Sequence, residues 1–199
     1  MVDIESEAVR LLEDNGFNPL EPPSGEYLAC CVVGARKVRR VNGLRRRALW
    51  SAERDEILFR PGLSQVMEDF FLRHEISERV IRPVDLSNED AEALCDRFAA
   101  ALTCPAPALR RALETEGRHL ARLAKAFRTS QSIIALRLGE VTGSPIALVT
   151  NRHVHVRGDQ WFQATPEEIR RVSQLRRIPE GLQRLQLTDA PRRVVLKAV

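Results

Sequence analysis

The sequence predicts an α+β protein made of one domain, or of one domain with a small appendage. At 199 residues the chain is long enough for one domain of ordinary size. Its hydrophobic fraction of 44% supplies enough apolar side chains for a core. Segments with the 3.6-residue apolar period of helices alternate with short apolar runs between glycines and prolines, which are typical of strands.

The first third of the chain is expected to hold one helix and a small sheet. An amphipathic helix is predicted over residues 4–16. The apolar run at 27–33 is predicted to be a buried strand, because a glycine lies close to each of its ends. The arginine-rich stretch 36–47 contains Asn42-Gly43, a strong hairpin-turn signal, so it is predicted to form a basic hairpin or loop. Two further strands are predicted at 48–50 and 56–59.

Two long helices are predicted in the middle of the chain, each with a capping residue at its start. Ser64 is a good N-cap for a helix that runs to about residue 81, shortly before Pro83. Ser87, with Asp90 three positions later, forms a capping box that opens a second helix, which ends near residue 102.

The rest of the chain is expected to hold a helical pair and a short α/β extension. The pair resembles a helix-turn-helix, because two short helices at 119–127 and 131–141 are separated by a tight turn and a serine cap. Thr165-Pro166-Glu167-Glu168 is a clear helix start. The other expected elements are a helix at 108–116, a hairpin of strands at 145–150 and 153–157, and a last strand at 193–196.

Composition and charge argue against several classes of protein. No apolar stretch of about 18 residues occurs, so no transmembrane helix and no membrane partner is expected. The acidic N-terminus lacks the residue order of a secretory signal, and we therefore expect a cytoplasmic protein. The four cysteines form no C-x-x-C pair, which argues against a zinc knuckle or a disulfide framework. A net charge of +4 permits nucleic-acid contact without requiring it.

The most informative segment is residues 70–81, on the first of the two long helices. It places His74 and Glu78 four positions apart, so both side chains share one helix face and are able to bind one metal ion. Glu75 follows His74 and is placed to handle a proton. The order is that of the H-E-x-x-H helix of zinc peptidases, with glutamate in place of the second histidine.

With the second long helix included, residues His74 to Pro105 resemble the ImmA/IrrE family of metallopeptidases. Two segments carry the resemblance: Leu72-Arg73-His74-Glu75-Ile76-Ser77 on the first helix, and Glu92 to Ala101 with the trailing Cys104-Pro105 on the second. The second segment follows the family's pattern E-x-x-x-x-x-F-A-A. The expected strands before these helices and the helical pair after them also fit, so the resemblance covers roughly residues 20 to 145.

The resemblance implies a zincin-like minimal metallopeptidase fold, in which a small sheet packs on the active-site helices. It implies a zinc ion bound by His74, by Glu92 and, in the place of the second histidine, by Glu78, with Glu75 as the general base for metal-activated water. Family members are regulatory proteases that cleave a helix-turn-helix transcriptional repressor and so release a stress, phage or mobile-element response. The implied division is a metallopeptidase-like domain at 1–105, a helix-turn-helix-like region at 106–143 and a C-terminal α/β extension at 144–199.

The glutamate at position 78 leaves two interpretations open. If a metal binds, its ligands are one imidazole and two carboxylates, which tolerate manganese or iron better relative to zinc than two histidines do. This interpretation predicts a slow metallopeptidase. If no metal binds, the protein is a catalytically silent pseudopeptidase that serves as a regulatory protein- or DNA-binding module. Its carboxylates would then form an ion-pair cluster with nearby arginines, namely Arg73, Arg79, Arg82 and Arg97.

DNA is a further candidate partner, which we do not favour. The helix-turn-helix-like pair offers phosphate contacts from its first helix but only a thin set of base contacts from its second. These candidate contacts are Arg122, Lys125, Arg128, Gln131 and Arg137. The basic stretch 36–47 lacks interleaved aromatic residues that would stack single-stranded bases. A solvated arginine-rich surface, or a surface for an acidic protein partner, is the preferred interpretation of that stretch.

Overall fold

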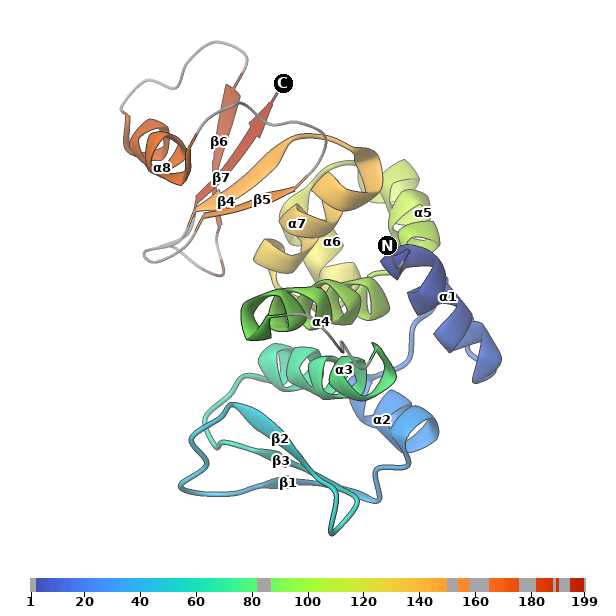
Figure 1. The fold of residues 1–199 in the computed structure, drawn as a ribbon. Coiled ribbons are helices and arrows are strands. Elements are labelled where there is room, and N and C mark those ends of the chain that lie inside the picture. Colours follow the sequence, from blue (N-terminus) through green and yellow to red (C-terminus); the bar gives the residue numbers. More distant parts are fainter. Residues whose placement is uncertain are drawn as a thin grey trace. The chain divides into compact units, whose positions relative to one another are not determined.

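The structure is a computed structural model that describes residues 3–81, 87–149, 154–157, 165–175, 182–187, 189 and 194–198. The described residues form a mixed fold of helices and small sheets, which confirms the predicted α+β class (Figure 1). The chain divides into two compact units, Met1–Ala108 and Leu109–Val199. The division into 1–105, 106–143 and 144–199 stays a prediction. None of the described helices has both the length and the apolar character that a membrane span requires.

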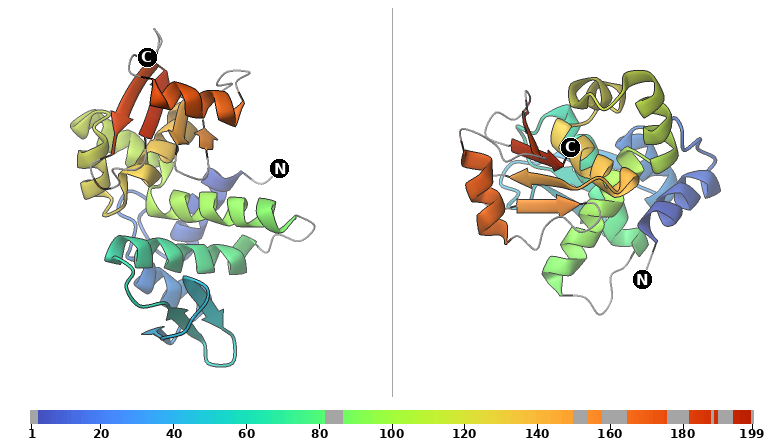
Figure 2. Two further views of the ribbon diagram at one scale, coloured as in Figure 1. Left: turned by 90° about the vertical axis from the view of Figure 1, so that its left-hand side faces the viewer. Right: turned by 90° about the horizontal axis from the view of Figure 1, so that it is seen from above.

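Two long helices form the centre of the first unit. They are α3 (Gln65–Ile81) and α4 (Asn88–Thr103), which lie side by side as Figure 2 shows. Helix α1 (Ile4–Asp14) packs on α4, and helix α2 (Gly25–Val33) packs on α3. The serine caps expected for α3 and α4 are confirmed: the hydroxyl of Ser64 accepts a hydrogen bond from Met67 N, and that of Ser87 accepts one from Asp90 N.

Helix α2 corrects the prediction of a buried strand at residues 27–33. Both ends of this segment carry helix caps. The side chain of Ser24 accepts a hydrogen bond from Tyr27 N, and Gly34 adopts the left-handed conformation, with φ of 70°, at the C-terminal end. Leu28 and Ala29 are buried while Cys30 and Cys31 are exposed, so one face of the segment is buried.

A small sheet packs against α3. It consists of β1 (Lys37–Arg40), β2 (Ala48–Ser51) and β3 (Glu56–Phe59), in the order β1-β3-β2. Strands β2 and β3, which were both expected from the sequence, pair in the antiparallel direction. For the arginine-rich stretch 36–47 the sequence predicts a hairpin or a loop. The hairpin is wrong, because β1 pairs in parallel with β3 and does not pair with β2, and residues 41–47 form a loop between β1 and β2. The apolar side chains of β3 take the centre of the sheet, whereas the charged β1 is left at an edge, where its side chains are solvated.

The core of the first unit lies where the central helices meet each other and the sheet. Its largest fully buried side chains come from α1, α2, β3, α3 and α4. They are Leu12, Leu28, Ile57, Phe59, Ile76, Phe98 and Leu102.

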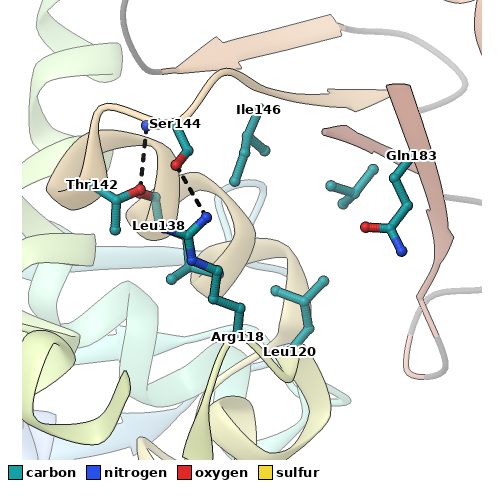
Figure 3. A pocket seen from close by; sticks show the side chains of 8 residues that line it. Arg118, Leu120, Leu138, Thr142, Ser144, Ile146 and Gln183 are labelled. Atoms are coloured by element: carbon teal, nitrogen blue, oxygen red, sulfur yellow. Dashed lines mark hydrogen bonds between the residues drawn. The ribbon is translucent and has the colours of Figure 1, made fainter. Parts of the chain in front are cut away.

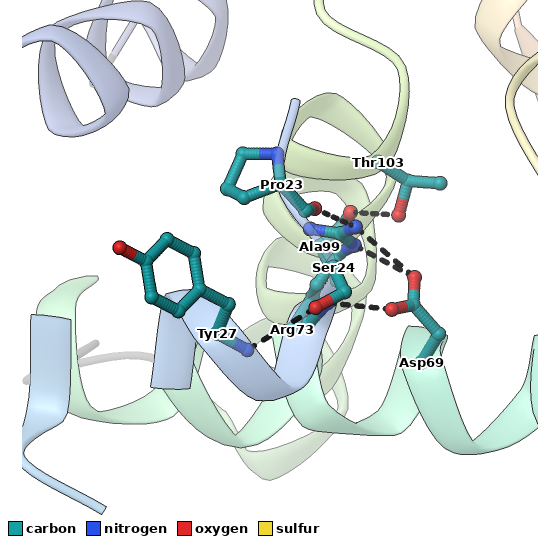
Figure 4. A network of polar contacts seen from close by, with 8 residues as sticks. Pro23, Ser24, Tyr27, Asp69, Arg73, Ala99 and Thr103 are labelled. Carbon is teal, nitrogen blue, oxygen red and sulfur yellow. Dashed lines mark hydrogen bonds and ion pairs between the residues drawn. The ribbon is translucent and has the colours of Figure 1, made fainter. Parts of the chain in front are cut away.

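A buried arginine ties the segment before α2 to α3 (Figure 4). The guanidinium of Arg73 is 4% exposed; its Nη2 donates to the carbonyl of Pro23 over 2.7 Å, and its Nε donates to Asp69 over 3.1 Å. Asp69 also accepts a hydrogen bond of 2.5 Å from Gly25 N. A Cβ at Gly25 would lie 2.8 Å from the Asp69 carbonyl oxygen, so only glycine fits this contact. Burial lowers the pKa of Arg73, although the neighbouring Asp69 opposes the effect.

The second unit begins within α5 (Ala106–Glu116) and continues with the expected helical pair. The pair consists of α6 (Leu120–Ala126) and α7 (Gln131–Thr142), which contact each other. Ser130 caps α7 as expected, because its side chain accepts a hydrogen bond from Ile133 N.

An antiparallel sheet completes the second unit. Its strands are β4 (Ile146–Val149), β5 (Val154–Arg157), β6 (Leu182–Gln186) and β7 (Val194–Ala198), in the order β5-β4-β7-β6. The predicted hairpin of β4 and β5 is confirmed; the residues between these strands lie outside the described part of the chain. Helix α8 (Pro166–Gln174) packs on β4 and β5, and Thr165 forms the expected capping box. The sequence did not predict β6.

Candidate metal centre

The two central helices of the first unit bring three ligand-type side chains together. The Nε2 atom of His74 lies 3.5 Å from a carboxylate oxygen of Glu78, one turn further along α3. The same Nε2 lies 3.3 Å from a carboxylate oxygen of Glu92 on α4. The three ligand atoms all lie within 4.8 Å of one another. The residues proposed from the sequence as metal ligands therefore converge on one point.

Local sequence signals account for this convergence. His74 and Glu78 share the face of α3 that contacts α4, because they are four positions apart. The Ser87 cap fixes where α4 begins, and Glu92 follows in the second turn of that helix. The side chain of His74 is 10% exposed, that of Glu78 is 36% exposed and that of Glu92 is 60% exposed. The imidazole is thus buried, and the group opens to solvent at Glu92.

A fourth side chain, which the sequence analysis missed, orients the imidazole. Asp96 lies one turn after Glu92 on α4, and its carboxylate is 2.9 Å from Nδ1 of His74. A proton on Nδ1 that is donated to Asp96 leaves the lone pair of Nε2 directed at the two glutamates. Metal-binding histidines usually have such a carboxylate or carbonyl partner on the other ring nitrogen. The four-residue spacing from Glu92 was the available signal.

The donor set fits a divalent cation. Ligands about 2.1 Å from a tetrahedral zinc ion are separated from one another by about 3.4 Å. The distances of 3.3 and 3.5 Å from the His74 nitrogen to the two carboxylate oxygens match that separation. One imidazole nitrogen and two carboxylate oxygens suit zinc, manganese or iron.

The carboxylates also favour a proton on the imidazole. Burial is the largest single influence on the pKa of His74 and lowers it. The hydrogen bond and charge of Asp96, with the charges of Glu78 and Glu92, outweigh burial, so the pKa is raised above 6.5. A metal ion must therefore compete with a proton for this site.

Glu75, the proposed general base, faces the sheet. Its Oε2 accepts a hydrogen bond of 2.9 Å from the backbone N–H of Trp50 in β2. Burial, followed by the nearby charge of Glu78, raises the pKa of Glu75 from 4.5 to about 7. Cys95, on α4 between Glu92 and Asp96, stays a thiol, because burial and the nearby carboxylates raise its pKa to about 12.

Of the four arginines expected to neutralise an empty site, Arg73 and Arg79 have described contacts with other side chains. Arg73 pairs with Asp69, away from the cluster, and the guanidinium of Arg79 lies 4.4 Å from the ring centroid of Trp50. Arg82 lies outside the described residues. Glu78, Glu92 and Asp96 each pair with the imidazole of His74, which is a partner that all three share.

The helical pair presents only part of the proposed DNA-contact set. The side chains of Arg122, Lys125 and Arg128 are exposed. Arg137 is fully buried and pairs with Glu140 over 2.7 Å, and Gln131 is also buried. Neither of these two side chains is available for base contacts, which corrects the expectation for them.

The second unit also contains a small cavity, shown in Figure 3. Its volume is about 200 Å³, and the guanidinium of Arg118 reaches the hydroxyl of Ser144 over 3.5 Å at its wall. The lining mixes apolar and polar side chains: Arg118, Leu120, Leu138, Thr142, Ser144, Ile146, Gln183 and Val195.

Comparison with known proteins establishes similarity of fold only. No model of a protein family matches the sequence, and no curated protein matches it. A solved structure described as a Mycobacterium tuberculosis transcriptional regulator aligns with a TM-score of 0.62 and 16% sequence identity. The alignment covers 81% of this chain and 57% of that one, so this chain spans little more than half the length of that regulator.

Proposed function

We propose that this protein is a metal-dependent peptidase of the ImmA/IrrE type, which acts on a helix-turn-helix transcriptional repressor. The observation that carries the proposal is the convergence of His74, Glu78 and Glu92 on one point, with Glu75 as their neighbour on α3. The similarity in fold to a transcriptional regulator supports a role in gene regulation.

The chain's own residues account for the proton transfers of peptide hydrolysis. A divalent cation at the three ligands would supply Lewis acidity toward a peptide carbonyl. With a pKa of about 7, Glu75 is partly protonated and partly ionised near neutral pH. It is therefore able to accept a proton from water and return it to the leaving amine nitrogen. The Trp50 N–H holds Oε2 in place and leaves Oε1 to carry the proton.

The glutamate at position 78 sets the expected rate. Two carboxylates and one imidazole bring one more negative charge to the cation than two imidazoles and one carboxylate do. A cation held by these three side chains would be a weaker Lewis acid, so we expect slower hydrolysis than in a member with both histidines. The oxygen-rich set also favours manganese or iron relative to zinc.

Metal analysis and one substitution test the proposal. The purified protein, equilibrated with zinc, manganese or iron(II) and desalted, should retain about one ion per chain. Glu75→Gln should retain the ion but lose cleavage of the repressor, because amide nitrogen and oxygen cannot accept the proton. A protein that retains none of the three ions is not a metallopeptidase.

A second candidate function is a non-catalytic regulatory module, which the glutamate at position 78 favours. Glu78→His separates the two functions, because it restores the second histidine of the H-E-x-x-H pattern. If the variant retains zinc while the natural protein retains no metal, the natural protein is a silent relative of the peptidases. If both retain metal and the variant cleaves faster, the enzyme proposal stands.

A further inference from the structure

The segment that forms the sheet of the first unit carries a larger net positive charge than the whole chain does. Residues 36–60 contain nine arginines and lysines against three acidic residues, a net charge of +6. The whole chain carries +4, so all other residues together carry −2. The metal-centre function proposed above does not account for this concentration of charge.

Ion pairs within the unit neutralise only some of these cations. Arg36 pairs with Asp55, Arg39 with Glu56, and Arg40 with Glu68 in a contact of 2.6 Å. Three consecutive arginines that follow the turn at Gly43 are different. They are exposed, and in the part of the chain that the structure describes no carboxylate lies within ion-pair distance of them; they are Arg45, Arg46 and Arg47.

Two of these arginines, Arg46 and Arg47, lie near the proposed general base. The guanidinium of Arg47 is 5.3 Å from the ring centroid of Phe71, which precedes Glu75 by one turn of α3. The charge of Arg46 acts on the Glu75 carboxylate and favours its ionised form. One turn after Glu75, Arg79 covers the ring of Trp50. One arginine–aromatic contact therefore lies one turn before Glu75 on α3, and another lies one turn after it.

The neighbouring backbone favours a polypeptide over a nucleic acid as the partner. Strand β2 is an outer strand of the three described strands, and its Trp50 N–H points away from β3 toward Glu75. Because this N–H is already bonded to Glu75, an extended peptide is able to pair only with the remaining outward-facing backbone groups of the outer strand. An arginine lies over one face of each of the two nearby aromatic rings, so that face is not open for stacking bases.

We propose that Arg45, Arg46 and Arg47 form a docking surface for an acidic polypeptide segment, which they hold beside Glu75. The partner is an extended stretch with several glutamates or aspartates, which meet the exposed guanidinium groups. The inference rests on the proposed function in one respect, namely that the bound segment is the one presented to the metal centre. Binding itself requires only the arginines and the sheet edge.

Peptide binding to the full chain tests this surface. A fluorescein-labelled peptide of alternating glutamate and alanine should bind at low ionic strength, whereas the matched peptide of glutamine and alanine should not. The double variant R46Q/R47Q should weaken binding about tenfold, because each exposed charge pair contributes up to about a fivefold change in affinity. The variant R46K/R47K keeps the charge and should bind like the natural protein. The matched control R110Q/R111Q removes two exposed arginines elsewhere and should change binding less than twofold.

Three results would overturn the inference. The first is that R46Q/R47Q and R110Q/R111Q weaken binding of the acidic peptide equally. The second is that the glutamate peptide and the glutamine peptide bind equally well. The third is that a DNA duplex binds more tightly than the acidic peptide at the same salt concentration. Peptide binding by E75Q, measured in the presence of a chelator, separates this inference from the proposed function, because it requires neither metal nor cleavage. If the natural protein retains no metal after equilibration but its peptide binding depends on the arginines, the peptidase proposal is rejected and the docking surface stands. If cleavage depends on metal but peptide binding does not depend on the arginines, the docking surface is rejected and the peptidase proposal stands.

Discussion

The buried carboxylate of Glu75 should make the protein less stable as the pH rises, and Glu75→Gln should remove that loss. Burial, with the charge of Glu78, raises the pKa of Glu75 from 4.5 to about 7 in the folded protein. In the unfolded chain the pKa keeps its ordinary value, so the unfolded state loses the proton first. The difference between the two pKa values corresponds to about 3 kcal/mol.

The sign of this effect follows from the direction of the pKa change. Below pH 4.5 the carboxyl group is protonated in both states, and its burial carries no penalty for charge. Between pH 4.5 and about 7 the unfolded state gains from ionisation that the folded state resists, so stability falls. Above about pH 7 the whole contribution of about 3 kcal/mol is lost.

Urea unfolding in the presence of a chelator measures the effect without bound metal. The free energy of unfolding of Glu75→Gln, relative to the natural protein, should increase by about 2.5 kcal/mol between about pH 5 and about pH 8. Glu13→Gln, at an exposed position on α1, is the matched control and should show no such increase. If the difference between Glu75→Gln and the natural protein is the same at both pH values, Glu75 does not titrate as argued.

Three other predictions concern the metal site, the thiols and a helix cap. Asp96→Ala should weaken binding of a divalent metal about tenfold, which is the low end of the effect of removing a supporting carboxylate. The low end is expected because the Asp96 side chain is 57% exposed and solvent screens its charge. Competition with a chelator measures the affinity, and an unchanged affinity would contradict the prediction. A thiol reagent should label Cys30 and Cys31 quickly, and the two buried cysteines only after unfolding. Thr165→Ala should destabilise the second unit by about 1 kcal/mol, because it breaks the capping box of α8; a thermal unfolding curve identical to that of the natural protein would refute this.

The candidate metal ligands could be brought together from the sequence because their positions depend on local rules. Helix periodicity places His74 and Glu78 on one face, and the Ser87 cap sets the start of the helix that carries Glu92. The family resemblance supplied the remaining information, namely that the two helices pack against each other. Each of these signals comes from a few neighbouring residues.

The features that the sequence analysis missed depend on contacts between distant segments or on competing signals. The pairing of β1 with β3 is a long-range choice, and the turn at Asn42-Gly43 suggested a local hairpin instead. The apolar run at 27–33 fits either a strand or a buried helix, and the caps at its two ends decide for the helix. The spacing of Asp96 from Glu92 shows that the two share a helix face, but the contact of Asp96 with His74 follows only from the packing of α4 on α3.

Competition between a proton and a metal ion connects the parts of this site. Burial alone would lower the pKa of His74, but Asp96 and the two glutamates raise it, so the same carboxylates that attract a cation also retain a proton on the ring. Metal affinity should therefore rise with pH up to the pKa of His74 and level off above it. Asp96→Ala removes part of the attraction for both the proton and the metal, so its loss of affinity should be smaller at low pH than on the plateau. A residue that only supported the fold would weaken binding equally at every pH, and that result would exclude the orienting role of Asp96.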